Sequence, residues 1–199
     1  MISTVLKRFT RLSAVLLVAA CTATPSTHFY ILEATGQSPA PVTDSAKQRL
    51  IGIGPVTLPT LLERKQIVTR TGNNSIHQAE FHQWAAPLKD NLVQVLTQNL
   101  AAQQPNAIIR AYPWSAFGTV NYHIIIDITR FDTTPKQSAN LEATWAIMND
   151  QTHTLISNGH SRIEHPLTDA SYAAAVDALG KTLGKFSREL SVALQQVYR

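Results

Sequence analysis

The sequence has a single cysteine and few charged residues. Cys21 is the only cysteine among 199 residues, so no disulfide can form within the chain. Charged residues make up 15% of the chain, against about 25% in a typical globular protein. The hydrophobic share of 44% is ordinary, and it excludes a wholly disordered chain. The length favours a single domain, which must be stable without disulfides.

Most of the positive net charge lies near the N-terminus. The full chain has 17 basic and 13 acidic residues, a net charge of +4. Lys7, Arg8 and Arg11 lie in a segment that we expect to be removed, which leaves 14 basic and 13 acidic residues. So small an excess lacks the electrostatic attraction that nonspecific phosphate binding requires. We therefore predict no nucleic-acid partner.

Recognisable metal-binding and nucleophile motifs are also missing. The histidines form no HExxH pair. His77 and His82 have opposite parity if the predicted strand runs straight through both, so they would then point to opposite faces. Ser161 lies near His160 and His165 in the sequence, but no G-x-S-x-G motif surrounds a serine. Solvated residues near strand ends are the simpler interpretation of this group.

The glycines of Gly52-Ile53-Gly54 do not indicate a phosphate-binding loop. Pro55 follows where such a loop needs the start of a helix. The sequence therefore predicts no metal, no cofactor and no enzymatic activity. It favours a binding or assembly component.

The first 20 residues have the pattern of an export signal. A basic segment precedes a mainly apolar run of nine residues, Leu12–Ala20, which is short of the roughly 20 residues that a membrane-spanning helix needs. Val18-Ala19-Ala20-Cys21 resembles a bacterial lipobox, in which the cysteine receives a diacylglyceryl group and fatty acids such as palmitate. We predict lipidation of Cys21. The alternative is an ordinary signal peptide with an incidental cysteine.

The residues after Cys21 indicate where the protein is anchored. Thr22 stands where an aspartate would retain a lipoprotein at the inner membrane, so the lipobox resemblance implies the outer membrane, on its periplasmic side. The polar segment Thr22–Thr27 is a tether of about 20 Å at most. We expect a signal peptide at 1–20, the lipidated cysteine and tether at 21–27, and one periplasmic domain at 28–199.

The hydrophobic pattern predicts an α+β domain with a mixed, largely antiparallel sheet. Gly72-Asn73-Asn74 favours a hairpin, and the last three strands are expected to form an antiparallel meander. The strand at 120–131 has apolar residues on both faces, which predicts a central, covered position. Strands are expected at His28–Leu32, Arg49–Leu58, Gln66–Arg70, Ser75–Phe81, Ala107–Ala111, Val120–Phe131, Asn140–Asn149 and Thr152–Glu164.

Two amphipathic helices are expected to pack on this sheet. The mid-chain helix spans Pro87–Gln104, and the long C-terminal helix spans Asp169–Tyr198 with Thr168 or Asp169 as its cap. Apolar residues of the second helix recur at alternating spacings of four and three. This pattern fits a helix lying on its own sheet, or one whose C-terminal part pairs with another chain. Gly180 and Gly184 indicate a close backbone approach.

The segment Gly52–Trp84 and the Ala-Ala-Pro-Leu after it carry a longer motif. A strand ends in G-P-V-x-L-P, then come a charged turn, R-x-Q-I-V-x-R, a hairpin, and a Trp before Pro-Leu. The matching residues are Pro55, Val56, Leu58, Pro59, Leu62, Arg64, Gln66, Ile67, Val68, Arg70, Trp84, Pro87 and Leu88. This motif resembles the PqiC-type family, the auxiliary lipoproteins of ABC-type and MCE-protein lipid transport systems. The order of the other elements agrees over nearly the whole mature chain.

The resemblance implies an outer-membrane lipoprotein that docks an MCE-type tunnel protein of the inner membrane and supports membrane integrity. Several copies would be needed to surround a tube, so a homo-oligomer, such as a ring, is expected. A periplasmic lipid carrier in its own right is an alternative function. A periplasmic hydrolase has little support in the sequence.

Four residues are candidates for partner contacts. Arg64, Gln66 and Arg70 lie around a charged turn beside apolar residues, and Trp114 lies in a predicted loop. For Arg64 and Arg70 the alternative is a solvated strand edge that blocks strand addition. Trp84 is instead expected to pack between the hairpin and the first helix.

Overall fold

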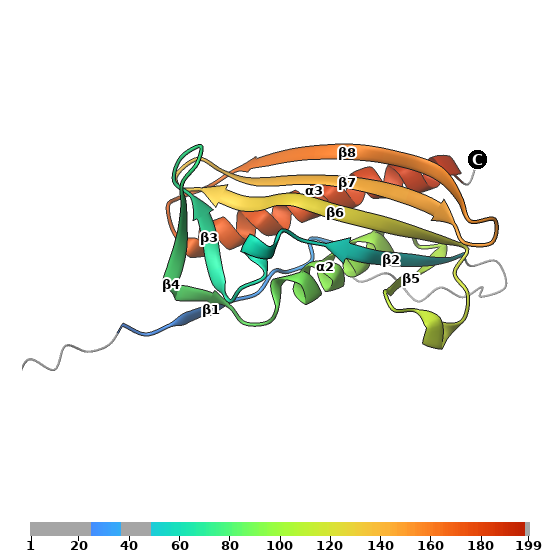
Figure 1. Cartoon of the computed structure of the whole chain (residues 1–199), viewed down its shortest axis with the longest axis horizontal. Helices are drawn as coiled ribbons and strands as arrows, with labels where there is room; N and C mark the ends of the chain where they lie inside the picture. Colours follow the sequence, from blue (N-terminus) through green and yellow to red (C-terminus); the bar gives the residue numbers. More distant parts are fainter. Residues whose placement is uncertain (1–24, 37–48, 198–199) are drawn as a thin grey trace, which may run out of the picture.

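The computed structural model describes residues 25–36 and 49–197. The predicted signal peptide, Cys21 and part of the tether lie outside these ranges. The elements, shown in Figure 1, are β1 (His28–Tyr30), β2 (Arg49–Thr57), η2 (Thr60–Leu62), β3 (Gln66–Arg70), β4 (Ile76–Trp84), α2 (Leu88–Gln103), β5 (Ala107–Ala111), η3 (Ser115–Phe117), β6 (Tyr122–Thr134), β7 (Ser138–Asn149), β8 (Thr154–Pro166) and α3 (Tyr172–Val197).

The strands form one mixed sheet, as predicted. The long strand β6 is central: β7 pairs with it along one side, while β2 and β3 pair with it on the other side at opposite ends. The longest ladders, β6 with β7 and β7 with β8, are antiparallel and confirm the predicted meander. Parallel pairing joins β1 to β4 and β2 to β5.

Both helices lie on the same face of the sheet (Figure 1). Helix α3 packs against β6, β7 and β8, and α2 packs against β2, β5 and α3. The apolar stripe of α2 is buried, as its spacing predicts, and so are the inward residues of β2 and β6. The largest fully buried side chains include Ile51, Ile53, Leu92, Leu96, Leu100, Ile124, Ile126, Ile128, Leu141, Ile147 and Phe186.

No helix within residues 25–36 and 49–197 covers the other face of β6. Ile125 is 37% exposed, so the prediction of a strand covered on both faces is wrong. Apolar residues on both faces of a strand do not reveal what covers the second one.

Helix α3 packs on its own sheet over its whole length. Leu190, Ala193 and Leu194 are buried, and the Gln104 side chain donates to the backbone oxygen of Ser191 at 2.9 Å. The C-terminal part of the apolar stripe is therefore used within the chain. The helix cap differs from the predicted one, because the hydroxyl of Ser171 accepts the Ala174 N–H at 3.1 Å.

Residues 31–36, which follow β1, run along the two helices and are held by buried asparagines. Asn91 accepts the Leu32 N–H at 2.7 Å and donates to the Leu32 carbonyl at 3.1 Å. Asn99 accepts the N–H groups of Thr35 and Gly36. We call residues 31–36 the strap.

The glycines of α3 make room for this strap. A Cβ atom on Gly180 would lie 3.5 Å from the Glu33 carbonyl oxygen, and one on Gly184 would collide with the Thr35 side chain. The predicted close backbone approach is confirmed.

Candidate functional site

Arg64 lies in the turn before β3, and Gln66 is the first residue of β3. The Arg64 Nε–H donates to the Leu61 carbonyl at 2.7 Å, and half-buried Gln66 pairs with Gln83 across β3 and β4. Strand β3 lies between β4 and β6. The alternative interpretation of a solvated strand edge is therefore wrong for Arg70, which ends β3, whereas Arg64 lies in the turn before this strand.

Arg70 belongs to an ion-pair network. Its guanidinium contacts the buried Asp132 carboxylate at 3.1 Å, and Arg130 contacts the same carboxylate at 3.0 Å. Glu142 continues the network toward Arg130 at 3.7 Å and Arg162 at 3.2 Å. A carboxylate as buried as Asp132 needs such partners, so Arg70 has a structural role in addition to any contact with a partner.

Trp114 is half-buried against the open face of the sheet. A Cβ atom on Gly52 would lie 2.7 Å from its ring, so only glycine leaves room for the indole there. The ring also lies 5.5 Å from His123 and 5.3 Å from Tyr112, centroid to centroid. Tyr112, at the start of this loop, is 60% exposed.

The Gly52-Ile53-Gly54 motif thus accommodates aromatic side chains. Gly54 has a φ of 120°, which side-chain-bearing residues rarely adopt, and a Cβ there would lie 2.8 Å from the Tyr112 Cβ. Sequence reasoning excluded a phosphate loop at this motif but missed this role. The aromatic pair in Tyr112-Pro113-Trp114, directly after a strand, is the signal that could have found it.

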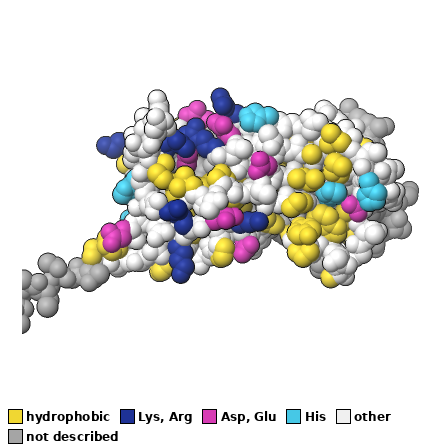
Figure 2. Space-filling model, in the orientation of Figure 1, with side chains coloured by type: hydrophobic (Ala, Val, Ile, Leu, Met, Phe, Trp, Pro, Cys, Tyr) yellow, Lys and Arg dark blue, Asp and Glu magenta, His cyan; other side chains and the backbone are white. Residues whose placement is uncertain are grey.

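Exposed apolar side chains gather around Trp114 on the open face. Figure 2 shows them in the half of the molecule away from the tether. Gly52 pairs with His123, His123 with Met148, and Met148 with Leu155, so these positions form one row across β2, β6, β7 and β8. The distal patch, as we call it, comprises Tyr112, Trp114, Ile125, Met148, Leu155 and Ile156.

The distal patch has few polar groups of its own. His123 Nδ1 lies 2.9 Å from the Asp150 carboxylate at its border. Leu155 is 52% exposed and Ile156 43%, where a register shift interrupts the pairing of β7 with β8. Single exposed apolar residues are ordinary, but a contiguous group marks a contact surface.

The four predicted contact residues do not converge on one site. Trp114 belongs to the distal patch, whereas Arg64, Gln66 and Arg70 lie on β3 and the turn before it, which are nearer the end where residue 25 enters β1 (Figure 1). We call that end the tether end.

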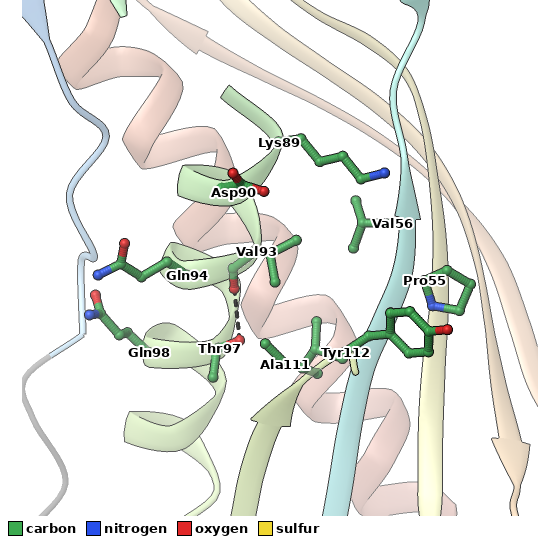
Figure 3. Close-up of a pocket in the computed structure, with 12 residues that line it drawn as sticks. Pro55, Val56, Lys89, Asp90, Val93, Gln94, Thr97, Gln98, Ala111 and Tyr112 are labelled. Atoms are coloured by element: carbon green, nitrogen blue, oxygen red, sulfur yellow. Dashed lines mark hydrogen bonds between the residues drawn. The ribbon is translucent and has the colours of Figure 1, made fainter. Parts of the chain in front are cut away.

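An open cavity of about 510 Å³ separates α2 from β2 and the end of β5. Figure 3 shows Val56 and Val93 facing each other across it, with Tyr112 near one end. Polar side chains of α2, including Lys89, Gln94 and Gln98, form its rim. An apolar floor with a polar rim suits an apolar ligand or a partner side chain.

An aromatic cluster surrounds His82 at the tether end. Its ring stacks on His28 and Tyr172 with centroid distances of 5.3 and 4.0 Å, and the Tyr30 hydroxyl lies 2.8 Å from His82 Nδ1. Burial, and then the proximity of His28, lower the pKa of His82. Burial raises the pKa of Tyr30, and burial together with Tyr30 raises that of Tyr172. The cluster therefore favours neutral rings.

The serine and histidines of β8 do not form a catalytic group. The Ser161 hydroxyl is buried and accepts the Trp145 indole N–H at 3.1 Å. Adjacent residues of a strand point to opposite faces, which separates His160 from Ser161. Among residues 25–36 and 49–197 there is no cluster of three or more metal-ligating side chains. In the same part of the chain no helix is long and apolar enough to cross a membrane.

The comparisons with known proteins identify the family of the chain. Residues 30–191 match the family described as the ABC-type transport auxiliary lipoprotein component. The match covers most of the chain, and the chain belongs to this family. It is therefore an auxiliary, membrane-associated lipoprotein of a transport system. The description of the family is that of a transport auxiliary component and not of a known enzyme family.

Curated relatives carry the name of the family already suspected from the sequence. The intermembrane transport lipoprotein PqiC of Escherichia coli (strain K12) is 26% identical over 187 residues, covering 94% of this chain and 95% of the relative. The PqiC of Shigella flexneri matches with the same values.

Two solved structures share the fold. One, of a protein described as uncharacterized, has a TM-score of 0.72 at 19% identity and covers 85% of this chain and 99% of its own. A protein from Xanthomonas campestris has a TM-score of 0.67 at 15% identity, with coverages of 86% and 99%. At these identities the likeness concerns the fold alone.

Proposed function

We propose that this protein is an outer-membrane lipoprotein subunit of an intermembrane lipid transport system. Fatty acids on Cys21 hold it to the periplasmic side of the membrane, and its domain docks an MCE-type tunnel protein that reaches out from the inner membrane. The names of the curated relatives, the lipobox and Thr22 after the cysteine support this proposal.

The position of the distal patch carries the docking part of the proposal. The chain enters the domain at the tether end, and the patch lies in the opposite half of the molecule (Figures 1 and 2). A protein held at one end by a tether of about 20 Å keeps that end close to its own membrane. The apolar surface at the other end is then available to a partner arriving across the periplasm.

The transport of apolar lipids gives a physical reason for docking close to the membrane. Exposing acyl chains to water costs about 0.8 kcal/mol for each CH₂, so a tunnel needs a sealed junction at the membrane it reaches. Several copies of a short-tethered lipoprotein, arranged as a homo-oligomer, would surround such a tube. Light scattering on the lipidated protein in detergent tests the oligomer, and a monomer at micromolar concentration would contradict it.

Photo-crosslinking in the native envelope tests the docking. A photoreactive residue replaces Tyr112 in the patch, and a matched control replaces Val192, which is similarly exposed at 54% on α3. We expect position 112 to form an adduct with a protein anchored in the inner membrane and position 192 to form none. The same adduct from both positions, or none from 112, would contradict docking through the patch.

The cavity of Figure 3 supports a second candidate, a lipid carrier in its own right. Its volume of about 510 Å³ and its apolar floor fit an acyl chain or a similar small apolar group. Native mass spectrometry of the protein distinguishes the two functions. A carrier retains phospholipid in that spectrum, whereas a docking subunit does not.

A further inference from the structure

Strand β1 and the first residue of the strap present two apolar side chains to solvent directly after the tether. Phe29 is 65% exposed and Ile31 is 52% exposed. They are two residues apart in extended chain, so they project to the same side, while Tyr30 between them contacts His82 on the other. No described part of the domain covers either side chain.

These side chains are held by a fixed backbone. The Ala85 N–H donates to the Tyr30 carbonyl at 2.8 Å, and β1 pairs with β4 in parallel. Asn91 holds both backbone groups of Leu32, which lies two residues after Tyr30. Among the described strands, β1 is an edge strand that pairs with β4 on one side only, and these hydrogen bonds hold the segment that carries Phe29 and Ile31 in place.

A cavity with cationic groups lies next to this strand. It has a volume of about 420 Å³ and is lined by the apolar segment Trp84–Leu88, whose first residues contact β1. Its charged lining comprises Arg64, Lys65 and Lys89 together with Glu63 and Asp90. Three cationic side chains, interspersed with two carboxylates, lie near two exposed apolar residues, and a surface of phosphate groups over hydrocarbon accommodates this combination.

The length of the tether identifies that surface. Six residues separate Cys21 from His28, and an extended chain of that length spans about 20 Å. If Cys21 carries the lipid anchor, Phe29 and Ile31 cannot move far from the bilayer that holds it. A bilayer is therefore the occupant that reaches them without any further assembly.

We infer that Phe29 and Ile31 insert into the headgroup region of the bilayer that holds the lipid anchor, with Arg64, Lys65 and Lys89 beside the lipid phosphates. This inference rests on the proposed lipidation of Cys21. The contact makes the tether end a second attachment point and limits the rotation of the domain about its tether. It thereby holds the distal patch away from the membrane.

A fluorescent label on a new cysteine tests the contact. In the lipidated protein the Cys21 sulfur is blocked, so Phe29→Cys introduces the only free thiol, and Val192→Cys provides an exposed control site remote in sequence. Each protein is labelled with an environment-sensitive fluorophore and reconstituted in vesicles of phosphatidylethanolamine and phosphatidylglycerol. Quenching by aqueous iodide is then measured, and intact mass records whether lipid is attached.

We expect the label at position 29 to show an emission shift to shorter wavelength and a quenching constant about threefold smaller than that at 192, because an interfacial group loses much of its water contact. Ile31→Cys should give the same result. A lipidated, vesicle-bound protein whose labels are quenched equally would overturn this inference and leave the anchor intact. A protein without attached lipid would instead overturn the anchor itself, and the inference with it.

Discussion

The tether end and the distal half both expose apolar side chains, but they are built differently. At the tether end, backbone pairing and two buried asparagines fix a short strand and the strap, so that Phe29 and Ile31 project from a rigid edge. In the distal half, the open face of the sheet carries the distal patch, and an aromatic loop packs on Gly52. The difference indicates two contact surfaces in one small domain, one set by hydrogen bonds and one by packing.

Of the changes considered, removing the lipid anchor should have the largest effect, because it abolishes the membrane contact of the tether end. Cys21→Ser eliminates the thiol that receives the diacylglyceryl group, so the protein should pass from the membrane fraction to the soluble periplasm. Two apolar side chains contribute too little to hold it alone, since even one acyl chain binds only marginally. Fractionation with immunodetection measures this, and envelope resistance should be lost in parallel. A variant that stays in the membrane fraction would contradict the lipid anchor.

Gly52→Val should act on the distal half. Its side chain would displace the Trp114 ring, whose atoms lie 2.7 Å from the position of a Cβ. Overpacking of this kind costs up to about 3 kcal/mol. Urea unfolding measures the free energy of unfolding. The yield of the crosslink from position 112 should also fall. Gly72→Ala is the control, because only the Ser75 Cβ lies near that position, at 3.8 Å. Equal stabilities of the two variants would show that the ring does not depend on Gly52.

Asn91→Ala should act on the tether end. It removes two buried hydrogen bonds to Leu32 and leaves the backbone groups of the strap unpaired, at a cost of about 2 kcal/mol. Gln94→Ala, at an exposed position of the same helix, should change the free energy of unfolding little. Hydrogen exchange at Leu32 should rise in the Asn91 variant while β6 stays protected. Unchanged exchange at Leu32 would contradict the role of this side chain.

The smallest expected effect is a loss of stability in weak acid. Burial, followed by His28, lowers the pKa of His82, and burial, followed by Lys185 and Lys181, lowers that of His165, with Asp177 acting in the opposite direction. An unfolded histidine has a pKa near 6.5, so the unfolded chain binds more protons below that pH. Stability is therefore complete above about pH 6.5 and falls as the pH drops toward the folded values.

Thermal unfolding at pH 7.5 and pH 5.5 measures this dependence. The double variant His82→Gln, His165→Gln should show a smaller drop in Tm between the two pH values than the natural protein. An identical drop would assign the acid sensitivity to other groups.

Local patterns predicted the secondary structure well. Segments such as Gln66–Arg70 and Ala107–Ala111 form strands with the expected bounds, because alternation and turn residues are encoded locally. The family also followed from a motif spread over adjacent elements. The pairing of β2 with β5 and with β6 could not be derived, because parallel partners meet only through contacts distant in sequence.

The surfaces were harder to predict than the elements. Trp114 was correctly placed in a loop, but its dependence on Gly52 appears only when two distant segments meet. Arg70 could not be distinguished from a free surface charge until Asp132 was seen beside it. Phe29 and Ile31 were expected in a strand, whereas their exposure depends on which strands flank β1.

Energy transfer from the two ends to the bilayer tests the central claim most directly. A donor fluorophore is placed on Phe29→Cys or on Tyr112→Cys in the lipidated protein, and acceptor lipids are included in the vesicle membrane. Two distinct contact surfaces predict strong transfer from position 29 and much weaker transfer from position 112. Equal transfer from both positions would mean that the domain lies flat on the membrane or tumbles freely, and it would contradict the account.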